Sequence, residues 1–281
     1  MTNNFSSCYQ ISSFVTNARD NIFVIKYGGS VMKNEILKFQ IMQDIAFLHS
    51  IGIKIILVHG GGFFINYWLN RLNISSYFDK GIRITDLQTM SVTEMVLSGQ
   101  VNKDLVALLN QLKISAVGLS GKDGSLIMAS PISDSVHNLT GQVRAINANV
   151  LNVLISNNYI PIVSSVALGL DGRAYNINAD TAAGAIAKAV GASKLILLTD
   201  TPGIMLNLND SSTLIKNLNT AQIQDLKKNK IIHGGMIPKV DCCIDAVNHD
   251  VSSAHIIDGR INHALLLETL TYNRLGSTIK A

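Results

Sequence analysis

Two glycine clusters stand where apolar segments end, and both have the composition of an anion-binding loop. The first, Gly28 and Gly29, follows Lys26, and the second, Gly60–Gly62, follows His59. Glycine lets backbone approach a ligand, and free N–H groups at the start of a following helix suit phosphate oxygens. Neither cluster matches the G-x-x-x-x-G-K-[ST] phosphate loop or the G-x-G-x-x-G dinucleotide fingerprint. Each cluster alone is more typical of a tight turn, so the prediction of a phosphate site rests on the pair and on the lysine.

Three further segments carry polar groups that could hold or orient a ligand. Tyr175–Asp180 alternates Asn, Asn and Asp before an Ala-rich segment, where Asn178 or Asp180 could equally be a helix cap. Leu198–Gly203 has the composition of a loop beside a nucleotide, although its Thr-Asp-x-Pro-Gly order also suits a plain turn. Gly234–Lys239 supplies a second lysine beside a glycine pair. We interpret both nearby histidines, at positions 59 and 233, as structural.

The elements that must position these groups predict an α/β fold with a mainly parallel central sheet between helices. Strand, glycine turn and helix occur twice in succession near the N-terminus, an order that is typical of a parallel sheet covered by helices. Apolar segments predict strands at Ile22–Tyr27, Lys54–His59, Ala116–Leu119, Ile160–Ser164, Lys194–Thr199 and Ile256–Asp258, and hairpin material at Gly141–Ile146. Helical spacing predicts helices at Glu35–Ile51, Phe63–Leu72, Thr89–Leu112, Val150–Asn157 and Ala179–Val190. Parallel sheets bind ligands beyond the carboxyl ends of their strands, where both glycine clusters fall.

Composition excludes several classes of protein. The chain has 281 residues, of which 47% are hydrophobic and 15% charged, enough for a full core and unlike a disordered chain. No apolar segment approaches the roughly 20 residues of a membrane span. The formal charge of +4 suits anionic substrates, but no basic block indicates a nucleic acid partner. Three cysteines without zinc-ligand spacing favour a reducing compartment and no metal held by the protein.

In order and spacing, the motifs resemble those of the amino acid kinase family, over nearly the whole chain from Ile22 to Ile279. The matching segments are Lys26–Ser30, His59–Gly62, Asn176–Asp180, Leu198–Gly203 and Gly234–Lys239. Together with Lys80–Thr85, they are most similar to members from photosynthetic organisms that use N-acetyl-L-glutamate. The resemblance implies the amino acid kinase fold and ATP-dependent phosphorylation of that substrate's side-chain carboxylate, a step of arginine biosynthesis. It implies two lobes in one compact unit, residues 22–170 for acetylglutamate and 171–281 for ATP.

The resemblance also implies a role for each site residue. Lys26 and Lys239 would stabilise the transferring phosphoryl group, and Asp180 would orient both lysines. The substrate-binding residues would be Gly61, Gly62, Arg83, Asn176 and Asn178, and the nucleotide-binding residues Gly28, Gly29, Thr199, Asp200 and Gly203. Arg83 would bind the α-carboxylate through its planar, bidentate guanidinium. Mg²⁺ would arrive with ATP. The attacking carboxylate is already ionised at neutral pH, so no general base is required.

Members of this family that are inhibited by arginine suggest regulation and assembly. They carry an N-terminal helix that interlaces dimers into a hexamer, and a C-terminal His…Leu-x-Glu…Gly-x-Gly-Thr segment. Here His263, Glu268 and Gly276 fit that segment, whereas Arg274 and Ser277 depart from it. We therefore expect an arginine effector site there and a homodimer or homohexamer. Residues 1–21 are either such an oligomerisation arm or a frayed terminus. Photosynthetic relatives also bind the PII signalling protein, which this sequence neither requires nor excludes.

The sequence leaves alternatives open for both the location and the activity of the protein. A composition rich in Ile, Asn, Lys and Ser, without a transit peptide, favours a plastid-encoded protein of the chloroplast stroma, and a bacterial cytoplasm is the alternative. A kinase of the same fold could act on aspartate, glutamate, carbamate or UMP, which a substrate panel would decide. A catalytically silent amino-acid sensor would bind arginine without ATP turnover. A nicotinamide-dependent oxidoreductase lacks its fingerprint here.

Overall fold

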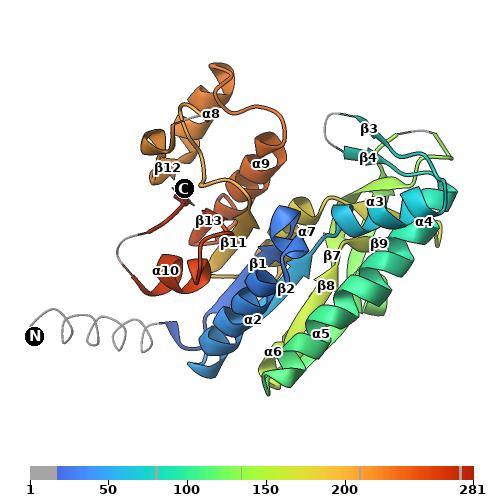
Figure 1. The fold of residues 1–281 in the computed structure, drawn as a ribbon, viewed down its shortest axis with the longest axis horizontal. Coiled ribbons are helices and arrows are strands. Elements are labelled where there is room, and N and C mark those ends of the chain that lie inside the picture. The colour runs from blue at the N-terminus through green and yellow to red at the C-terminus, as the bar shows by residue number, and fades with distance from the viewer. Residues whose placement is uncertain (1–17, 80–81, 134, 209, 272–273) are drawn as a thin grey trace, which may run out of the picture.

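An eight-stranded sheet forms the centre of the molecule (Figure 1). The computed structural model describes residues 18–79, 82–133, 135–208, 210–271 and 274–281. The strand order is β12-β14-β13-β11-β1-β2-β8-β5, and every neighbouring pair is parallel except β13 and β14. The strands are β1 (Ile22–Tyr27), β2 (Lys54–His59), β5 (Ala116–Ser120), β8 (Ile160–Ser164), β11 (Lys194–Thr199), β12 (Asn217–Asn219), β13 (Ser253–Asp258) and β14 (Ser277–Lys280). The predicted mainly parallel sheet is confirmed.

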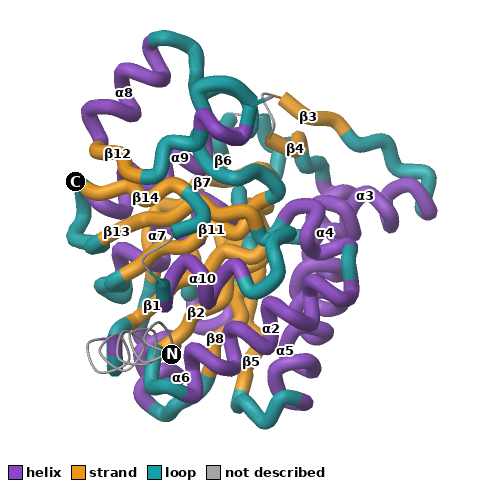
Figure 2. Tube along the Cα trace, turned by 60° about the vertical axis from the view of Figure 1, so that its left-hand side comes forward, coloured by secondary structure: helices purple, strands orange, loops and turns teal. Residues whose placement is uncertain are grey.

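Helices cover both faces of this sheet. The α-helices of the described residues are α2 (Glu35–Ser50), α3 (Gly62–Arg71), α4 (Leu87–Glu94), α5 (Asn102–Gln111), α6 (Asn149–Ser156), α7 (Ala179–Ala189), α8 (Thr220–Lys228), α9 (Met236–Val247) and α10 (Ala264–Leu270). α2 packs with α5 and α10, and α7 packs with α9; Figure 2 shows the strands between these helices. The central strands are therefore buried on both sides, which is why they are continuous apolar segments without alternation.

Two smaller strand groups stand beside the sheet. β6 (Ile127–Pro131), β7 (Thr140–Ile146), β9 (Val166–Gly169) and β10 (Ala174–Ile177) close a small barrel, and β3 (Tyr77–Asp79) pairs with β4 (Ile82–Ile84) as a separate hairpin. The predicted hairpin segment lies in β7, which pairs antiparallel with β6. The division expected after residue 170 falls in the turn between β9 and β10, and it stays a prediction. Most of the expected N-terminal arm, residues 1–17, lies outside the described residues.

The continuous helix predicted for Thr89–Leu112 is wrong in its middle. α4 ends at Glu94, a π-helix spans Met95–Val101, and α5 begins at Asn102. A π-helix contains one more residue in each turn than an α-helix, so the side chains that follow it face in a different direction. Apolar spacing alone does not distinguish these two helices. The shift turns Leu97 towards Gly61, whose added Cβ would lie 2.7 Å from the Cδ2 atom of Leu97.

Candidate active site

A buried carboxylate holds two lysines at the centre of the site. The Nζ atom of Lys26, at the end of β1, lies 2.9 Å from Oδ1 of Asp180. Lys239, in the first turn of α9, donates to Oδ2 of the same residue at 2.7 Å. Burial alone would raise the pKa of Asp180, but the charges of Lys26 and Lys239 outweigh it and lower the pKa to about 2. The carboxylate therefore stays ionised, and both ammonium groups are fixed on one side of the sheet.

Both glycine clusters line a cavity of about 470 Å³ beside this carboxylate. Gly61 precedes α3 as its N-cap without a side-chain cap, so backbone N–H groups are available at the start of the helix. A Cβ atom at Gly28 would lie 2.6 Å from Nζ of Lys26, and a side chain there would displace the amine. This cavity combines a cation, ionised Asp180 and glycine backbone, a composition that suits a phosphoryl group.

Arg83 closes the other end of this cavity. Its side chain is buried, and Nη2 donates to Oδ1 of Asn66 at 2.6 Å and to the carbonyl of Gly62 at 3.4 Å. Nη1 donates to Ser76, and the guanidinium lies 4.6 Å from the ring centroid of Phe78 in the β3–β4 hairpin. A guanidinium held in this way can bind a carboxylate in the cavity through its remaining N–H groups.

Asn66 and Phe78 both contact Arg83 at this end of the cavity, and the sequence analysis identified neither of them. Asn66 lies one helical turn after Gly62, so the helical period that predicts α3 also places its side chain on the glycine side. That spacing was a usable signal. Phe78 lies in a hairpin of two three-residue strands, which carries no clear pattern in the sequence.

The two asparagines of the Asn-x-Asn-x-Asp segment have different roles in the structure. Nδ2 of Asn176 donates to Thr85 at 3.0 Å, which fixes the amide beside the cavity. Asn178 is the N-cap of α7, because Oδ1 accepts from the backbone N–H groups of Asp180 and Thr181 at 2.9 and 3.1 Å. The capping interpretation therefore holds for Asn178, while Asp180 is free to hold the lysines.

A second cavity, of about 310 Å³, adjoins the first. It is lined by Thr199, Asp200, Gly203, Ile204, Met205, Leu208, Lys239, the segment 231–235 and other residues. Asp200 borders both cavities, and Lys239 connects this one to Asp180. The apolar side chains suit a planar base, and the N-terminus of α9 offers backbone N–H groups for phosphates. Gly28 and Gly29, expected beside the nucleotide, line the first cavity, and their role stays a prediction.

The three residues expected to bind arginine lie around α10. Oε2 of Glu268 accepts from the N–H groups of Leu275 and Gly276 at 2.8 and 3.2 Å, and Oε1 lies 2.8 Å from Nδ1 of His255. His263 precedes α10 in the left-handed conformation, and its Nδ1 atom lies 2.7 Å from Asp44 of α2. Glu268 and Gly276 are thus brought together, whereas His263 contacts a different helix.

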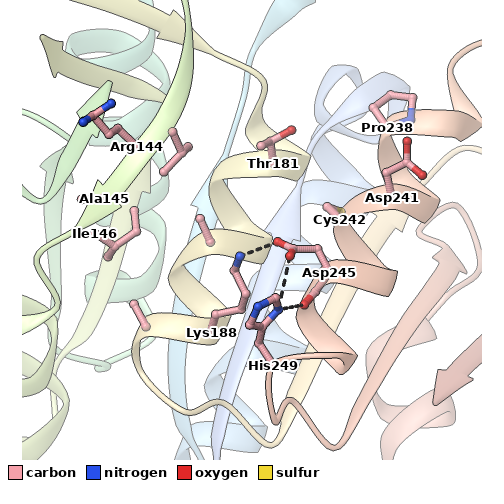
Figure 3. A pocket seen from close by; sticks show the side chains of 13 residues that line it. Arg144, Ala145, Ile146, Thr181, Lys188, Pro238, Asp241, Cys242, Asp245 and His249 are labelled. Atoms are coloured by element: carbon pink, nitrogen blue, oxygen red, sulfur yellow. Dashed lines mark hydrogen bonds and ion pairs between the residues drawn. The ribbon is translucent and has the colours of Figure 1, made fainter. Parts of the chain in front are cut away.

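A third and larger cavity, of about 720 Å³, contains none of the expected site residues (Figure 3). It lies between β7 and the helices α7 and α9. Lys188 and His249 both pair with Asp245 there, and Arg144 extends from the opposite wall. Asp241 and Asp245 also line this cavity, so its positive charge is less concentrated than that of the site around Lys26 and Lys239.

Within the described residues, no group of three or more His, Cys, Asp or Glu side chains is arranged to hold a metal ion. Among the same residues, no helix combines the length and apolar character needed to cross a membrane.

Comparison with known proteins identifies the family. The model of the amino acid kinase family matches residues 21–258. An acetylglutamate kinase of Gracilaria tenuistipitata var. liui is 56% identical over 283 residues, covering 99% of each chain. That of Prochlorococcus marinus is 52% identical over 256 residues, covering 91% of this chain and 84% of its own. The solved structure of smu.665 from Streptococcus mutans UA159 has a TM-score of 0.78 and 28% identity, covering 92% of this chain and 98% of its own.

The fold also matches an N-acetylglutamate synthase from Neisseria gonorrhoeae, with a TM-score of 0.85 and 21% identity, over 99% of this chain and 63% of that chain. At that identity the likeness concerns the fold alone. The family model and the curated relatives cover most of the chain and carry the assignment: the chain belongs to the amino acid kinase family, in its acetylglutamate kinase branch.

Proposed function

We propose that this protein is an acetylglutamate kinase (EC 2.7.2.8), which transfers the γ-phosphoryl group of ATP to the side-chain carboxylate of N-acetyl-L-glutamate in arginine biosynthesis. The observation that carries the proposal is the Asp180 carboxylate, which holds Lys26 and Lys239 where the two cavities adjoin. The names of the curated relatives support the choice of substrate. The product is an acyl phosphate, N-acetyl-L-glutamyl 5-phosphate.

The cavities divide the two substrates between them. The acetylated amino acid lies in the first, with its α-carboxylate on Arg83 and its acetylamino group towards Asn176. Mg-ATP lies in the second, beside Thr199 and Gly203, with its phosphates directed towards Lys239. The metal enters with ATP as part of the substrate, which is the usual way in which proteins bind Mg²⁺ at phosphate groups.

The protein then promotes the reaction by aligning the two substrates and by placing positive charge beside the transferring phosphoryl group. A carboxylate oxygen of the substrate attacks the γ-phosphorus, the bond to the β,γ-bridging oxygen breaks, and ADP leaves with that electron pair. No proton is transferred, because the nucleophile is ionised at neutral pH. The main obstacle is the approach of two anions. Lys26, Lys239 and the N–H groups of Gly61 and Gly62 stabilise the negative charge on the transferring group.

The same proposal extends to regulation. Arginine inhibits the enzyme at the C-terminal site that includes Glu268 and Gly276, which α10 brings together. Arginine added to the assay tests this, since unchanged activity would remove arginine from the proposal. The resemblance to arginine-inhibited members supports a homodimer or homohexamer, which light scattering measures. The resemblance to photosynthetic members supports contact with the PII protein, which co-purification measures. The chloroplast stroma is the proposed location, since the relatives include red algal and cyanobacterial proteins.

The decisive experiment traps the product. The purified chain is mixed with Mg-ATP and N-acetyl-L-glutamate, and hydroxylamine converts any acyl phosphate into a coloured hydroxamate. Glutamate and aspartate are tested in parallel. Lys239→Ala is expected to lower kcat by about 100-fold or more, as expected on removing an electrostatic stabiliser. Lys227→Ala, which breaks an exposed pair with Asp241, is the matched control. Absence of colour with every acid, in folded protein, would overturn the proposal.

A further inference from the structure

His59, at the end of β2, is fully buried and makes hydrogen bonds through both ring nitrogens. Nδ1 lies 2.9 Å from the carbonyl oxygen of Gly60, and Nε2 lies 3.1 Å from Nδ2 of Asn102. Neither His59 nor Asn102 lines the two cavities proposed for the substrates. The pair nevertheless contacts the glycine loop directly, from the side facing the protein core.

The partners determine where the proton is. Complete burial lowers the pKa of His59 to about 4, so the ring is neutral when the enzyme works. The carbonyl of Gly60 can only accept, so Nδ1 carries the hydrogen, and Nε2 accepts from the amide of Asn102. One tautomer satisfies both contacts, and the ring therefore has a single orientation.

This hydrogen bond controls the direction of an N–H group in the site. A trans peptide is planar, and its C=O and N–H point in opposite directions. Fixing the carbonyl of Gly60 towards His59 therefore turns the N–H of Gly61 away from the core. Gly61 lines the cavity beside Lys26. Its N–H donates to no backbone or side-chain oxygen among the residues that the structure describes.

Asn102 anchors the histidine to the sheet. Its two Nδ2 hydrogens are shared between the ring of His59 and the carbonyls of Ile162 at 2.8 Å and Leu119 at 3.3 Å, on the neighbouring strands β8 and β5. Nζ of Lys103 donates to its Oδ1 atom at 3.2 Å. A Cβ atom at Gly118 would lie 1.9 Å from that oxygen, so the backbone leaves room for one amide position. The π-helix ends immediately before Asn102, which lies beside β5 and β8.

We propose that His59 and Asn102 are positioning residues for phosphoryl transfer, which fix the peptide between Gly60 and Gly61 so that its N–H faces the transferring group. The proposal rests on the proposed function. It predicts a loss in kcat with little change in KM, because a correctly oriented donor matters most when charge develops in the transition state.

The matched variants are His59→Asn and His59→Gln. The Nδ2 atom of asparagine occupies the place of Nδ1 in histidine and can still donate to the carbonyl of Gly60. The amide of glutamine lies farther from the backbone, towards Asn102. We expect His59→Gln to lower kcat by about 10- to 100-fold with KM changed by less than about threefold, and His59→Asn to retain most of kcat. Asn102→Ala should resemble His59→Gln. His49→Leu, at a buried histidine near the far end of α2, controls for general loss of packing.

The outcomes separate this inference from the proposed function. Lack of turnover by the wild-type protein would be a failure of the proposed function. Turnover by the wild-type with equal kcat in the asparagine and glutamine variants would overturn the inference. The pH profile is a second readout, because a neutral His59 predicts that wild-type kcat shows no step near pH 6.5. A step there that disappears in His59→Asn would show that the histidine titrates during catalysis and would also overturn it.

Discussion

At the scale of single residues, Asp180 organises the charge of the site. Its two oxygens hold lysines from β1 and α9, and the low pKa that results keeps it ionised over the whole working range. Two ammonium groups near one another would otherwise repel. Asp180 therefore offsets the repulsion between the two lysines and directs both ammonium groups at one point.

We expect Asp180→Asn to lower kcat by about 100-fold or more, because a neutral amide cannot hold two ammonium groups. The hydroxamate assay measures the loss. Asp241→Asn, on the same helix as Lys239 but in an exposed pair with Lys227, should keep wild-type kcat. Comparable losses in both variants would mean that Asp180 acts through the packing of α9 rather than through its charge.

The buried His59 is expected to make the free energy of unfolding depend on pH. Its pKa is about 4 in the folded protein against 6.5 as the ordinary value. Between these pH values the unfolded chain binds a proton at His59 that the folded protein excludes. Acidification therefore lowers the free energy of unfolding, and this loss of stability stops growing below about pH 4. The contribution is about 2 kcal/mol between about pH 7.5 and pH 5.

His59→Asn removes this titration. Urea unfolding at both pH values should show that the variant loses about 2 kcal/mol less than the wild type on acidification. Comparing the change with pH, rather than the stability itself, cancels any packing defect of the variant and the titration of the other histidines. An identical pH dependence in the two proteins would contradict a neutral, buried His59.

The charged residues of the proposed phosphoryl site could be predicted from the sequence, whereas the residues that hold this site in place could not. Lys26, Asp180 and Lys239 stand beside glycines or a helix start, which are local patterns that resemble a known family. Asn102 and Ser76 act on residues 43 and 7 positions away in the chain, respectively. No local pattern records such a contact, since it exists only after the sheet has formed.

At the scale of elements, burial decides what the sequence reveals. β1, β2, β8 and β11 are mainly apolar because helices cover both faces, and their bounds were predicted without error. β12 and the β3–β4 hairpin are short and largely exposed, so they lack that signal. The π-helix was missed because the buried residues Val92, Val96, Val101 and Leu105 recur at intervals of four or five positions, which sequence alone does not distinguish from an α-helix.

The π-helix gives a prediction of its own. A methyl group at Gly61 would press on Leu97, so we expect Gly61→Ala to lower kcat by about tenfold or more by displacing the loop. Gly61→Ala combined with Leu97→Ala should recover part of the activity, because the second change makes room. Gly99→Ala, in the same π-helix but facing open space, is the control. A double variant no better than the single one would argue against this packing.

At the scale of the whole molecule, the site is assembled from parts of the chain that are far apart. Lys26, Asp180 and Lys239 lie on three elements, and β1 pairs directly with β11 from the second half of the chain. The central sheet is therefore continuous across both proposed lobes. Each substrate cavity nevertheless belongs mainly to one half, which allows the two ligands to be tested separately.

Ligand binding should stabilise the fold in a way that this division predicts. A ligand at about 100 times its Kd adds about 2.7 kcal/mol, or roughly 5 °C in Tm for a chain of this size. Lys239 lines the cavity proposed for Mg-ATP, and Arg83 lines the cavity proposed for N-acetyl-L-glutamate. Lys239→Ala should therefore reduce the shift caused by Mg-ATP and leave that of N-acetyl-L-glutamate, whereas Arg83→Lys should do the reverse, because lysine lacks the bidentate geometry. Arg144→Lys, in the third cavity, should change neither shift. Loss of both shifts in either variant would place the two ligands in one shared cavity and refute the division between them.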